Sequence, residues 1–513
     1  MVEQRSERDV PTVADAHLHR SMTRAGRAGV PFNRRTLFVM GGSALLLSAC
    51  QADPRRATPV PGPAKSPAIS GQVASTVDTL FSAKPFYIGH RGSGDNWPEH
   101  TREAYSKAVE LGAQAIEISV NATSDGVLVC HHDKSTLRST GQDLIISETT
   151  WAELSTLRVD ARDWLGPAAE PQPIPRLDDV LDLFAATHVI FIEDKQGTNA
   201  VALLDLMDTY PDATSHFVWK QWGGAGQYAL AAERGYKCWG YFGPELFGDL
   251  DRLAGRFDYL GVPHTASDAE IARVVAFGKP VIAWEIHYRW MKDRMGALGV
   301  AGLMCSNLPY VTEIAQPETV DHFASGLRTA GDLPWTTDKG WGVQPAFVEK
   351  NESISLSHQD IQSYLMGSMS PSGADTYRIQ CELCWPDRLP QAREHAGIAF
   401  CADDDRPYRV RIAGEVSAYH VILRPTGSLE LFRRAAGDVD GTLLGSVDTT
   451  AARAGQWVQL EVAVTPVGIT VYRLDGRGWS FETKDAAYRG SYFWLCKNYR
   501  GAPPVEFRAV KIL

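Results

Sequence analysis

Short apolar runs alternate with amphipathic stretches between residues 78 and 318. Runs suited to buried parallel strands occur at Pro85–His90, Ala115–Val120, Val189–Glu193, His216–Gln221, Lys237–Phe242, Phe257–Val262, Pro280–Ile286 and Gly302–Ser306. Helical stretches such as Thr101–Leu111 and Leu177–Ala186 lie between them. Strand–helix units that number about eight in roughly 240 residues match an α/β fold of the TIM (β/α)8 barrel type. A doubly wound sheet is the alternative, because periodicity does not show whether a sheet closes.

A different pattern follows at residues 351–513, where short segments alternate between apolar and polar residues. Examples are Thr376–Trp385, Trp457–Val464 and Val505–Ile512, and Gly, Pro and Asp separate such segments. Many short strands with turn signals between them predict an all-β sandwich or jelly roll. Residues 319–350 are then a linker and lead-in between the two domains.

The first 50 residues lack this periodicity and are typical of an export signal. Arg34 and Arg35 precede a short apolar run, as in a twin-arginine signal. The segment Leu47–Cys50 resembles a lipobox, in which Cys50 would carry a lipid, although an uncleaved anchor or a plain signal with a chance cysteine is the alternative. Residues 51–77, rich in Ala, Pro and Ser, would form a flexible tether. We therefore expect an exported, cell-surface lipoprotein with a lipid anchor in the membrane.

Composition and charge narrow the classes of function. The chain is 44% hydrophobic and 22% charged, which is ordinary for a globular protein and argues against a disordered chain or a multi-span membrane protein. Its formal net charge is -10. An acidic chain argues against a general nucleic-acid binder, which needs a basic surface.

Polar and ionisable residues gather at the ends of the predicted barrel strands. They are His90 and Arg91 after the first strand, Glu117 and Ser119 on the second, His132 after the next turn, and Glu193 and Lys195 on the third. Because the carboxyl ends of barrel strands form one face, these side chains should converge. Histidines suit a general acid and base, Arg and Lys bind phosphate, and carboxylates on neighbouring strands suit Ca²⁺ or Mg²⁺. The group favours metal-assisted cleavage of a phosphodiester.

These motifs resemble the glycerophosphodiester phosphodiesterase family over most of the predicted barrel. The family pattern contains HRG, P-E-N-T, G-A-D-x-I-E-x-D-V and D-G-x-x-V-x-x-H-D, followed by an I-E-x-K strand. The similar segments here are His90–Gly92, Pro98–Thr101, Gly112–Val120, Asp125–Asp133 and Ile192–Lys195. The resemblance implies a TIM barrel that hydrolyses glycerophosphodiesters to glycerol 3-phosphate and an alcohol.

The resemblance also implies roles for single residues. His90 and His132 would be the acid–base pair, Arg91 and Lys195 would contact the phosphate, and Glu99 would support the site. In such enzymes the glycerol hydroxyl next to the phosphoester attacks phosphorus and gives a cyclic phosphate, which water then opens.

The implied metal site departs from the family pattern. Glu117 and Glu193 would be ligands of Ca²⁺ or Mg²⁺, but the family's second metal carboxylate is Ser119 here, a doubtful ligand. The Asn of P-E-N-T is His100, and the family's closing T-D-x-P is Ser306–Pro309. Three interpretations follow. In the first, the metal is held more weakly, and water or His100 replaces the missing ligand. In the second, the enzyme acts on a different substrate. In the third, the site is inactive.

Further features are weaker signals. Lys220, Trp284 and His287 fall near predicted strand ends and could line the pocket, although each also suits a structural role, and Trp284 matches an aromatic that the family often carries. The segments Trp457–Val462 and Tyr492–Leu495 resemble concanavalin-type sandwiches, which often bind carbohydrate. An exposed aromatic would stack on a sugar, whereas a buried one would belong to the core.

The sequence as a whole predicts a metal-dependent hydrolase at the cell surface. Its substrate would be a glycerophosphodiester, either a deacylated phospholipid or a teichoic-acid-like polymer of the cell wall. Two alternatives remain open. One is a phospholipase D-like lyase that stops at the cyclic phosphate, and the other is a catalytically impaired surface binding protein that has lost its metal site through Ser119.

Overall fold

The computed structural model describes residues 75–314, 318–328, 344–359, 363–365, 374–409, 413–498 and 501–513. The predicted export signal, the lipid site at Cys50 and the tether as far as residue 74 lie outside the described residues. Within the described ranges, none of the helices combines the length and the apolar character that crossing a membrane requires.

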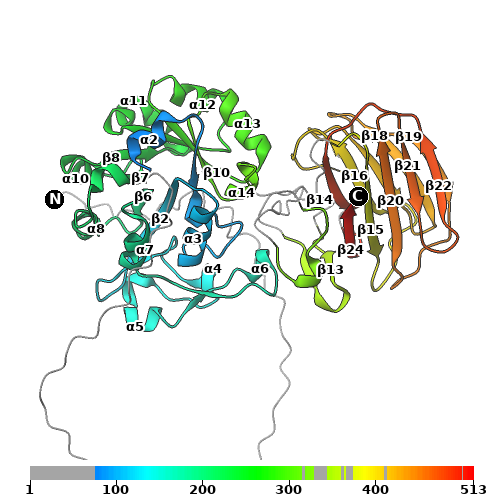
Figure 1. Cartoon of the computed structure of the whole chain (residues 1–513), viewed down its shortest axis with the longest axis horizontal. Coiled ribbons are helices and arrows are strands. Elements are labelled where there is room, and N and C mark those ends of the chain that lie inside the picture. The colour runs from blue at the N-terminus through cyan, green and yellow to red at the C-terminus, as the bar shows by residue number, and fades with distance from the viewer. Residues whose placement is uncertain are drawn as a thin grey trace, which may run out of the picture. The chain divides into compact units, whose positions relative to one another are not determined.

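Eight parallel strands form a closed barrel (Figure 1). They are β1 (Phe86–Gly89), β2 (Ala115–Ala122), β6 (Val189–Asp194), β7 (Phe217–Trp222), β8 (Lys237–Tyr241), β9 (Tyr259–Pro263), β10 (Val281–Ile286) and β11 (Gly302–Cys305). Neighbours in this order pair with each other, β11 pairs with β1, and the contact of Ile88 with Ala115 joins β1 to β2. The predicted barrel is confirmed, and its closure rules out the doubly wound alternative.

Helices alternate with these strands and cover the outside of the barrel (Figure 1). They are α2 (Val77–Ser82), α3 (Arg102–Glu110), α4 (Leu137–Thr140), α5 (Trp151–Leu154), α6 (Arg162–Leu165), α7 (Leu177–Phe184), α8 (Ala200–Met207), α9 (Ala213–His216), α10 (Tyr228–Glu233), α11 (Leu250–Leu253), α12 (Asp268–Val275), α13 (Arg289–Ala297) and α14 (Leu308–Val311). Helix α7 illustrates their packing, because Leu177, Val180, Leu181 and Phe184 form one apolar stripe at helical spacing and join the core.

A hairpin interrupts the alternation after β2. The chain turns at residues 124–125 and returns as the short antiparallel strand β3 (Leu128–Cys130), which pairs Cys130 with Val120. The return places His131 and His132 directly after β3. A second small antiparallel pair, β4 (Arg158–Val159) and β5 (Gln172–Pro173), follows in the same connection between β2 and β6.

Two antiparallel sheets form the C-terminal domain (Figure 1). The order of the first is β12 (Ala346–Val348), β13 (Ser353–Leu356), β24 (Val505–Ile512), β15 (Tyr377–Cys384), β20 (Val458–Thr465), β21 (Gly468–Arg473) and β22 (Trp479–Thr483). The order of the second is β14 (Ser363–Leu365), β23 (Tyr492–Lys497), β16 (Ala396–Ala402), β17 (Ala418–Leu423), β18 (Ser428–Arg434) and β19 (Thr442–Asp448). Ile379 and Leu383 of the first sheet share a core with Ile398 and Val421 of the second. The predicted sandwich is confirmed, and β12 lies within the segment expected to lead into it.

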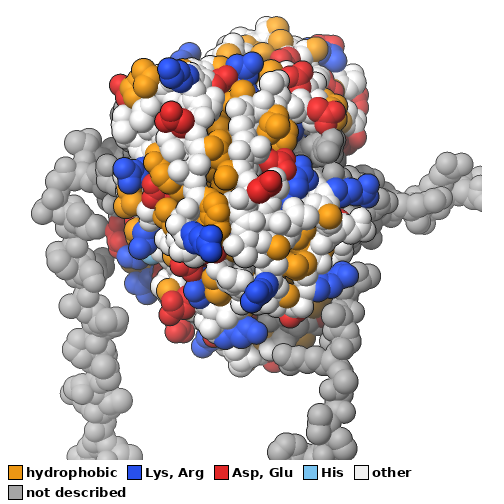
Figure 2. All heavy atoms as spheres, turned by 90° about the vertical axis from the view of Figure 1, so that its right-hand side faces the viewer, with side chains coloured by type: hydrophobic (Ala, Val, Ile, Leu, Met, Phe, Trp, Pro, Cys, Tyr) orange, Lys and Arg blue, Asp and Glu red, His pale blue; other side chains and the backbone are white. Residues whose placement is uncertain are grey.

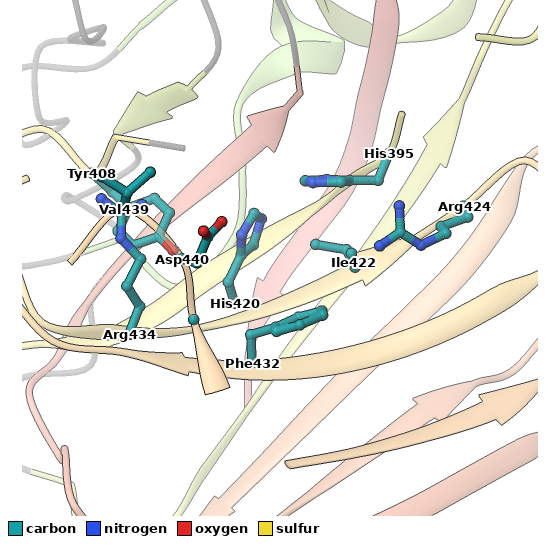
Figure 3. Close-up of a pocket in the computed structure, with 10 residues that line it drawn as sticks. His395, Tyr408, His420, Ile422, Arg424, Phe432, Arg434, Val439 and Asp440 are labelled. Carbon is teal, nitrogen blue, oxygen red and sulfur yellow. The ribbon is translucent and has the colours of Figure 1, made fainter. Parts of the chain in front are cut away.

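The aromatic side chains at the end of the sandwich belong to its interior. Phe493, Trp494 and Phe507 have 0% of their surface exposed, so they pack in the core and do not offer a ring to a sugar. The face of the molecule in Figure 2 mixes basic, acidic and hydrophobic side chains. The sandwich also contains a pocket of about 130 Å³ over β17 and β18, and His395 and His420 are among the residues that line it (Figure 3).

Candidate active site

The mouth of the barrel lies at the carboxyl ends of its strands, and polar side chains of three adjacent strands meet there. Ser119 of β2 pairs with Glu193 of β6, and Ile192 of β6 pairs with Trp219 of β7. The residues that follow this second pair are Glu193 and Lys220. Strand register alone therefore places Glu193 and Lys220 side by side.

Lys220 lies between the two buried glutamates that were expected to bind a metal. Its Nζ is 2.7 Å from Oε1 of Glu117 and 2.7 Å from Oε2 of Glu193. The exposed fractions of the three side chains are 8% for Lys220, 0% for Glu117 and 6% for Glu193. Burial lowers the pKa of Lys220, but Glu117 and Glu193 outweigh burial and raise it. The ammonium thus joins β7 to both β2 and β6.

Both oxygens of Glu117 accept hydrogen bonds from the protein. Oε1 accepts from Lys220 and from the hydroxyl of Ser119 at 3.0 Å, and Oε2 accepts from the backbone N–H of Arg91 at 3.0 Å. Burial raises the pKa of Glu117, but Lys220 outweighs burial and holds it well below its usual range. Glu117 is therefore ionised, and each of its oxygens already accepts from a protein donor.

These donors do not fit the expected Ca²⁺ or Mg²⁺ site. Ca²⁺ takes about six to eight oxygen ligands, and Mg²⁺ demands an octahedron of them. Here the hydroxyl of Ser119 donates to Glu117, and an ammonium stands between the two carboxylates that would hold the ion. Among the described residues, no group of three or more His, Cys, Asp or Glu side chains is placed to hold a metal. Glu117 and Glu193 lie together as expected, but they surround a lysine.

His132 is oriented by the carboxylate that follows it. Its Nδ1 lies 2.6 Å from Oδ1 of Asp133. Since a carboxylate only accepts, Nδ1 carries the proton and Nε2 keeps its lone pair. Burial lowers the pKa of His132 well below its usual value, and Arg91 and Lys195 act in the same direction. Asp133 is the last residue of the motif that contains His132. The motif therefore indicated its position but not its role as the partner of His132.

His90 follows β1 and is the second buried imidazole of the mouth. Its Nδ1 lies 2.8 Å from Oγ of Ser306, and its Nε2 lies 3.9 Å from Oε1 of Glu285. Burial and the charge of Arg91 lower the pKa of His90 to about 4, although Glu285 acts in the opposite direction. The mouth therefore holds two imidazoles that are neutral at pH 7.

Arg91 is held by a tight turn and by Glu99. Its own φ is 53°, and the next residue, Gly92, has a φ of 77°, where an added Cβ would lie 2.8 Å from the Cβ of Ala104. Only glycine fits at this second position. Glu99 accepts from Nη1 of Arg91 at 3.2 Å and from Nη1 of Arg138 at 3.0 Å. The carboxylate thereby fixes the Arg91 guanidinium. Arg138 is a second partner of Glu99, and no sequence motif indicated it.

Lys195 is the more accessible of the two lysines, with 15% of its side chain exposed. Its Nζ lies 3.6 Å from Oε2 of Glu193, and burial lowers its pKa. Tyr241 of β8 donates to the other oxygen of Glu193 at 2.6 Å and packs against Trp284, with 5.2 Å between ring centroids. Trp284 therefore lies beside the site, and Tyr241 is a second partner that the sequence had not indicated.

An acidic pair with a charged histidine completes the mouth. Oε1 of Glu285 lies 3.6 Å from Nη2 of Arg91, and Oε2 of Glu285 lies 3.6 Å from Nε2 of His287. Nδ1 of His287 lies 2.7 Å from Asp95. Burial lowers the pKa of His287, but Asp95 and Glu285 outweigh burial and raise it to about 10. Glu285 directly follows Trp284, which the sequence indicated as a possible pocket residue. No sequence motif indicated that Asp95 lies at the site.

His100 and His131 are buried near the mouth. Nδ1 of His100 lies 2.7 Å from the hydroxyl of Tyr105, and its Nε2 has no hydrogen-bond partner among the described residues. Burial lowers the pKa of His100 to about 3. Both ring nitrogens of His131 are engaged, by a backbone oxygen at 2.9 Å and by Ser139 at 2.8 Å, so His131 has a structural role.

Comparison with known proteins finds a family model and curated relatives that match the part of the chain that contains these residues. Residues 90–220 match the Glycerophosphoryl diester phosphodiesterase family. The chain is 36% identical to a glycerophosphodiester phosphodiesterase of Caldanaerobacter subterraneus over 115 residues, which are 22% of this chain and 46% of that relative. It is 33% identical to a glycerophosphodiester phosphodiesterase of Bacillus subtilis over 146 residues, or 27% of this chain and 46% of the relative. The chain thus spans about half the length of the curated relatives it matches.

Solved structures also resemble the chain. One is a phosphodiesterase of Oleispira antarctica in complex with the product sn-glycerol-3-phosphate, with 18% identity and a TM-score of 0.40, covering 46% of this chain and 98% of that one. Another is a glycerophosphodiester phosphodiesterase of Thermotoga maritima, with 21% identity and a TM-score of 0.37, covering 45% of this chain and 99% of that one.

Proposed function

We propose that this chain hydrolyses glycerophosphodiesters to glycerol 3-phosphate and an alcohol, because residues 90–220 match the Glycerophosphoryl diester phosphodiesterase family. One observation carries the proposal. The neutral imidazoles of His90 and His132 share the barrel mouth with the cations Arg91 and Lys195, which lower the pKa of His132. A pair of imidazoles can move protons, and two cations can hold a phosphate between them.

The first step forms a cyclic phosphate. The glycerol hydroxyl next to the phosphoester attacks phosphorus, a new P–O bond forms, and the hydroxyl proton passes to Nε2 of His132. The P–O bond to the alcohol breaks, and His90 donates the proton that the leaving oxygen needs. His90 takes up that proton when substrate binds, because the phosphate anion offsets the charge of Arg91, which otherwise lowers the pKa of His90.

The second step reverses the roles of the imidazoles. Water attacks the cyclic phosphate and gives a proton to His90, which is now neutral. The P–O bond of the ring breaks, and His132 returns its proton to the released glycerol oxygen. His132 ends neutral and His90 ends protonated, as both were in the substrate complex, and one water has been consumed. His90 releases its proton when the product anion leaves, which restores the free enzyme.

Phosphorus NMR of the chain without its first 50 residues tests this function. The substrates are glycerophosphocholine, lysophosphatidylcholine and a glycerol-phosphate polymer. We expect glycerol 3-phosphate from the first, and its loss in H90A and in H132A, but not in H358A, which removes an exposed imidazole of the sandwich. A cyclic phosphate that persists would support the lyase instead. No turnover of any substrate would support the catalytically impaired binding protein.

The location of the chain is part of the proposal. We infer from the lipobox-like segment before Cys50 that the chain is exported and held at the membrane surface by a lipid. A polymer such as a teichoic acid would be within reach of a tethered enzyme there. Metabolic labelling with a fatty acid should mark the wild-type chain and not C50A. Label on both, or on neither, would contradict the anchor.

The sandwich would bring the barrel to a carbohydrate-containing polymer. We place carbohydrate in the pocket over β17 and β18, because Tyr408 and Phe432 supply apolar walls there and Arg424 and Asp440 supply polar groups (Figure 3). Imidazole, guanidinium and carboxylate groups bind sugar hydroxyls by hydrogen bonds. Co-sedimentation with purified cell walls should weaken in D440A and be unchanged in E415A, which removes an exposed carboxylate elsewhere on the sandwich. Equal binding by both variants would contradict this site.

A further inference from the structure

We propose that the ammonium of Lys220 takes the place of the divalent metal that the family resemblance implies, so that this barrel cleaves its substrate without a metal ion. The inference rests on the proposed function, since it concerns the same site. It goes further by assigning the positive charge of the site to a side chain of the protein.

The position of Lys220 carries the argument. Its Nζ lies 2.7 Å from an oxygen of Glu117 and 2.7 Å from an oxygen of Glu193, so it bridges the two carboxylates expected to hold the ion. Two aromatic rings also surround it, with centroids 6.0 Å away for Trp239 and 5.4 Å away for Tyr241. Aromatic faces attract a cation. A metal could enter only if this buried ammonium left both carboxylates and both rings.

The charge of the site is conserved by the exchange. In the family pattern a carboxylate occupies the position of Ser119, so a divalent ion with that carboxylate contributes +2 and −1, or +1 in total. Lys220 with the neutral Ser119 also contributes +1. The hydroxyl of Ser119 donates to Glu117 at 3.0 Å, which a carboxylate at that position could not do. The serine and the lysine therefore complement each other.

The charge of Lys220 favours catalysis because it offsets part of the charge of the two glutamates that it contacts. Glu117 and Glu193 are buried at the mouth, and two uncompensated carboxylates there would repel the anionic phosphodiester and, more strongly, a transition state with more negative charge. Lys220 bridges both carboxylates and offsets one of their two negative charges, and Lys195 and Arg91 are left to contact the phosphate. Lys220 is therefore a positioning residue, which acts through the two glutamates.

Metal titration of designed variants tests the inference. The chain without its first 50 residues is compared with S119D, K220A and the double variant S119D/K220A. Calorimetry with CaCl2 and with MgCl2 measures binding, and phosphorus NMR measures turnover of glycerophosphocholine with EDTA or with either ion. S119D is the matched control, because it adds the carboxylate and keeps the lysine.

We expect the wild type and S119D to bind neither ion at 1 mM metal, a test concentration on the order of ordinary site affinities. The wild-type rate should change less than about twofold between EDTA and either ion, whereas K220A should lose roughly 100-fold or more. S119D/K220A should bind an ion and regain turnover only when it is present. Loss of wild-type turnover in EDTA with recovery on adding metal would overturn the inference, as would calorimetric binding to the wild type. If the wild type turns over no substrate but only the double variant binds metal, the proposed function fails while the placement of Lys220 stands.

Discussion

His100 replaces the Asn of the family pattern, and reverting it in H100N should make the barrel more resistant to acid. His100 is 2% exposed, and burial lowers its pKa from 6.5 to about 3. The unfolded chain therefore binds a proton on this ring as the pH falls below 6.5, whereas the folded chain does not. The stability that depends on neutral His100 is fully present above pH 6.5 and declines as the pH falls through 6.5 toward 3.

The magnitude follows from these two values. At pH 5 the unfolded state gains about RT ln(1 + 10^1.5), or roughly 2 kcal/mol, from protonation of this ring, and the folded state gains almost nothing. At pH 8 protonation of this ring stabilises neither the folded nor the unfolded state. Asparagine does not titrate, and it tolerates the φ of 55° at this position. Loss of the hydrogen bond to Tyr105 costs stability at every pH, so the informative quantity is the difference between H100N and wild type at two pH values.

Urea unfolding followed by circular dichroism at 222 nm is the assay, because the described α-helices all belong to the barrel and this signal therefore reports on it. The free energy of unfolding of H100N relative to wild type should rise by about 2 kcal/mol from pH 8 to pH 5. H358N, which removes an exposed imidazole of the sandwich, controls for the loss of one histidine. A relative stability that is equal at both pH values would refute the reasoning, since it would mean that folded His100 accepts the proton.

Three further predictions concern the charges of the mouth. E99Q should lower the free energy of unfolding by about 3 kcal/mol, because it removes the carboxylate charge that Arg91 and Arg138 share and leaves Arg91 with Glu285 alone and Arg138 with Asp133 alone, and denaturant titration measures the loss. D133N should reduce the rate constant kcat roughly 100-fold with little change in KM, because His132 loses the partner that sets its tautomer. The raised pKa of His287 gives stability that is fully present below pH 6.5 and is lost as the pH rises toward 10, so H287Q should be most destabilised near pH 6, by about 3 kcal/mol more than at pH 9. A pH-independent deficit in H287Q would contradict the charged histidine.

The barrel could be predicted from the sequence because its strands are short apolar runs buried on both sides, as β6 shows. Its closure could not be predicted, because it depends on the pairing of Ile88 with Ala115 and not on any local pattern. Residues after strands could be assigned to one face, since all parallel strands of a barrel end at the same rim. This rule placed His90 and Lys195 at the mouth from their positions alone. It says nothing about partners such as Asp95, which come from turns whose course depends on tertiary packing.

Ser119 and Lys220 show where reasoning from single motifs ends. Taken alone, Ser119 is a missing metal ligand and suggests a weakened or inactive site, while Lys220 is one of several polar residues near strand ends. The barrel puts both residues against Glu117, one on β2 and one on β7, and together the ammonium and the neutral hydroxyl carry the same charge as a divalent ion with a carboxylate. A departure that suggests a failed site and a lysine with no assigned role therefore form one consistent site when they are considered together.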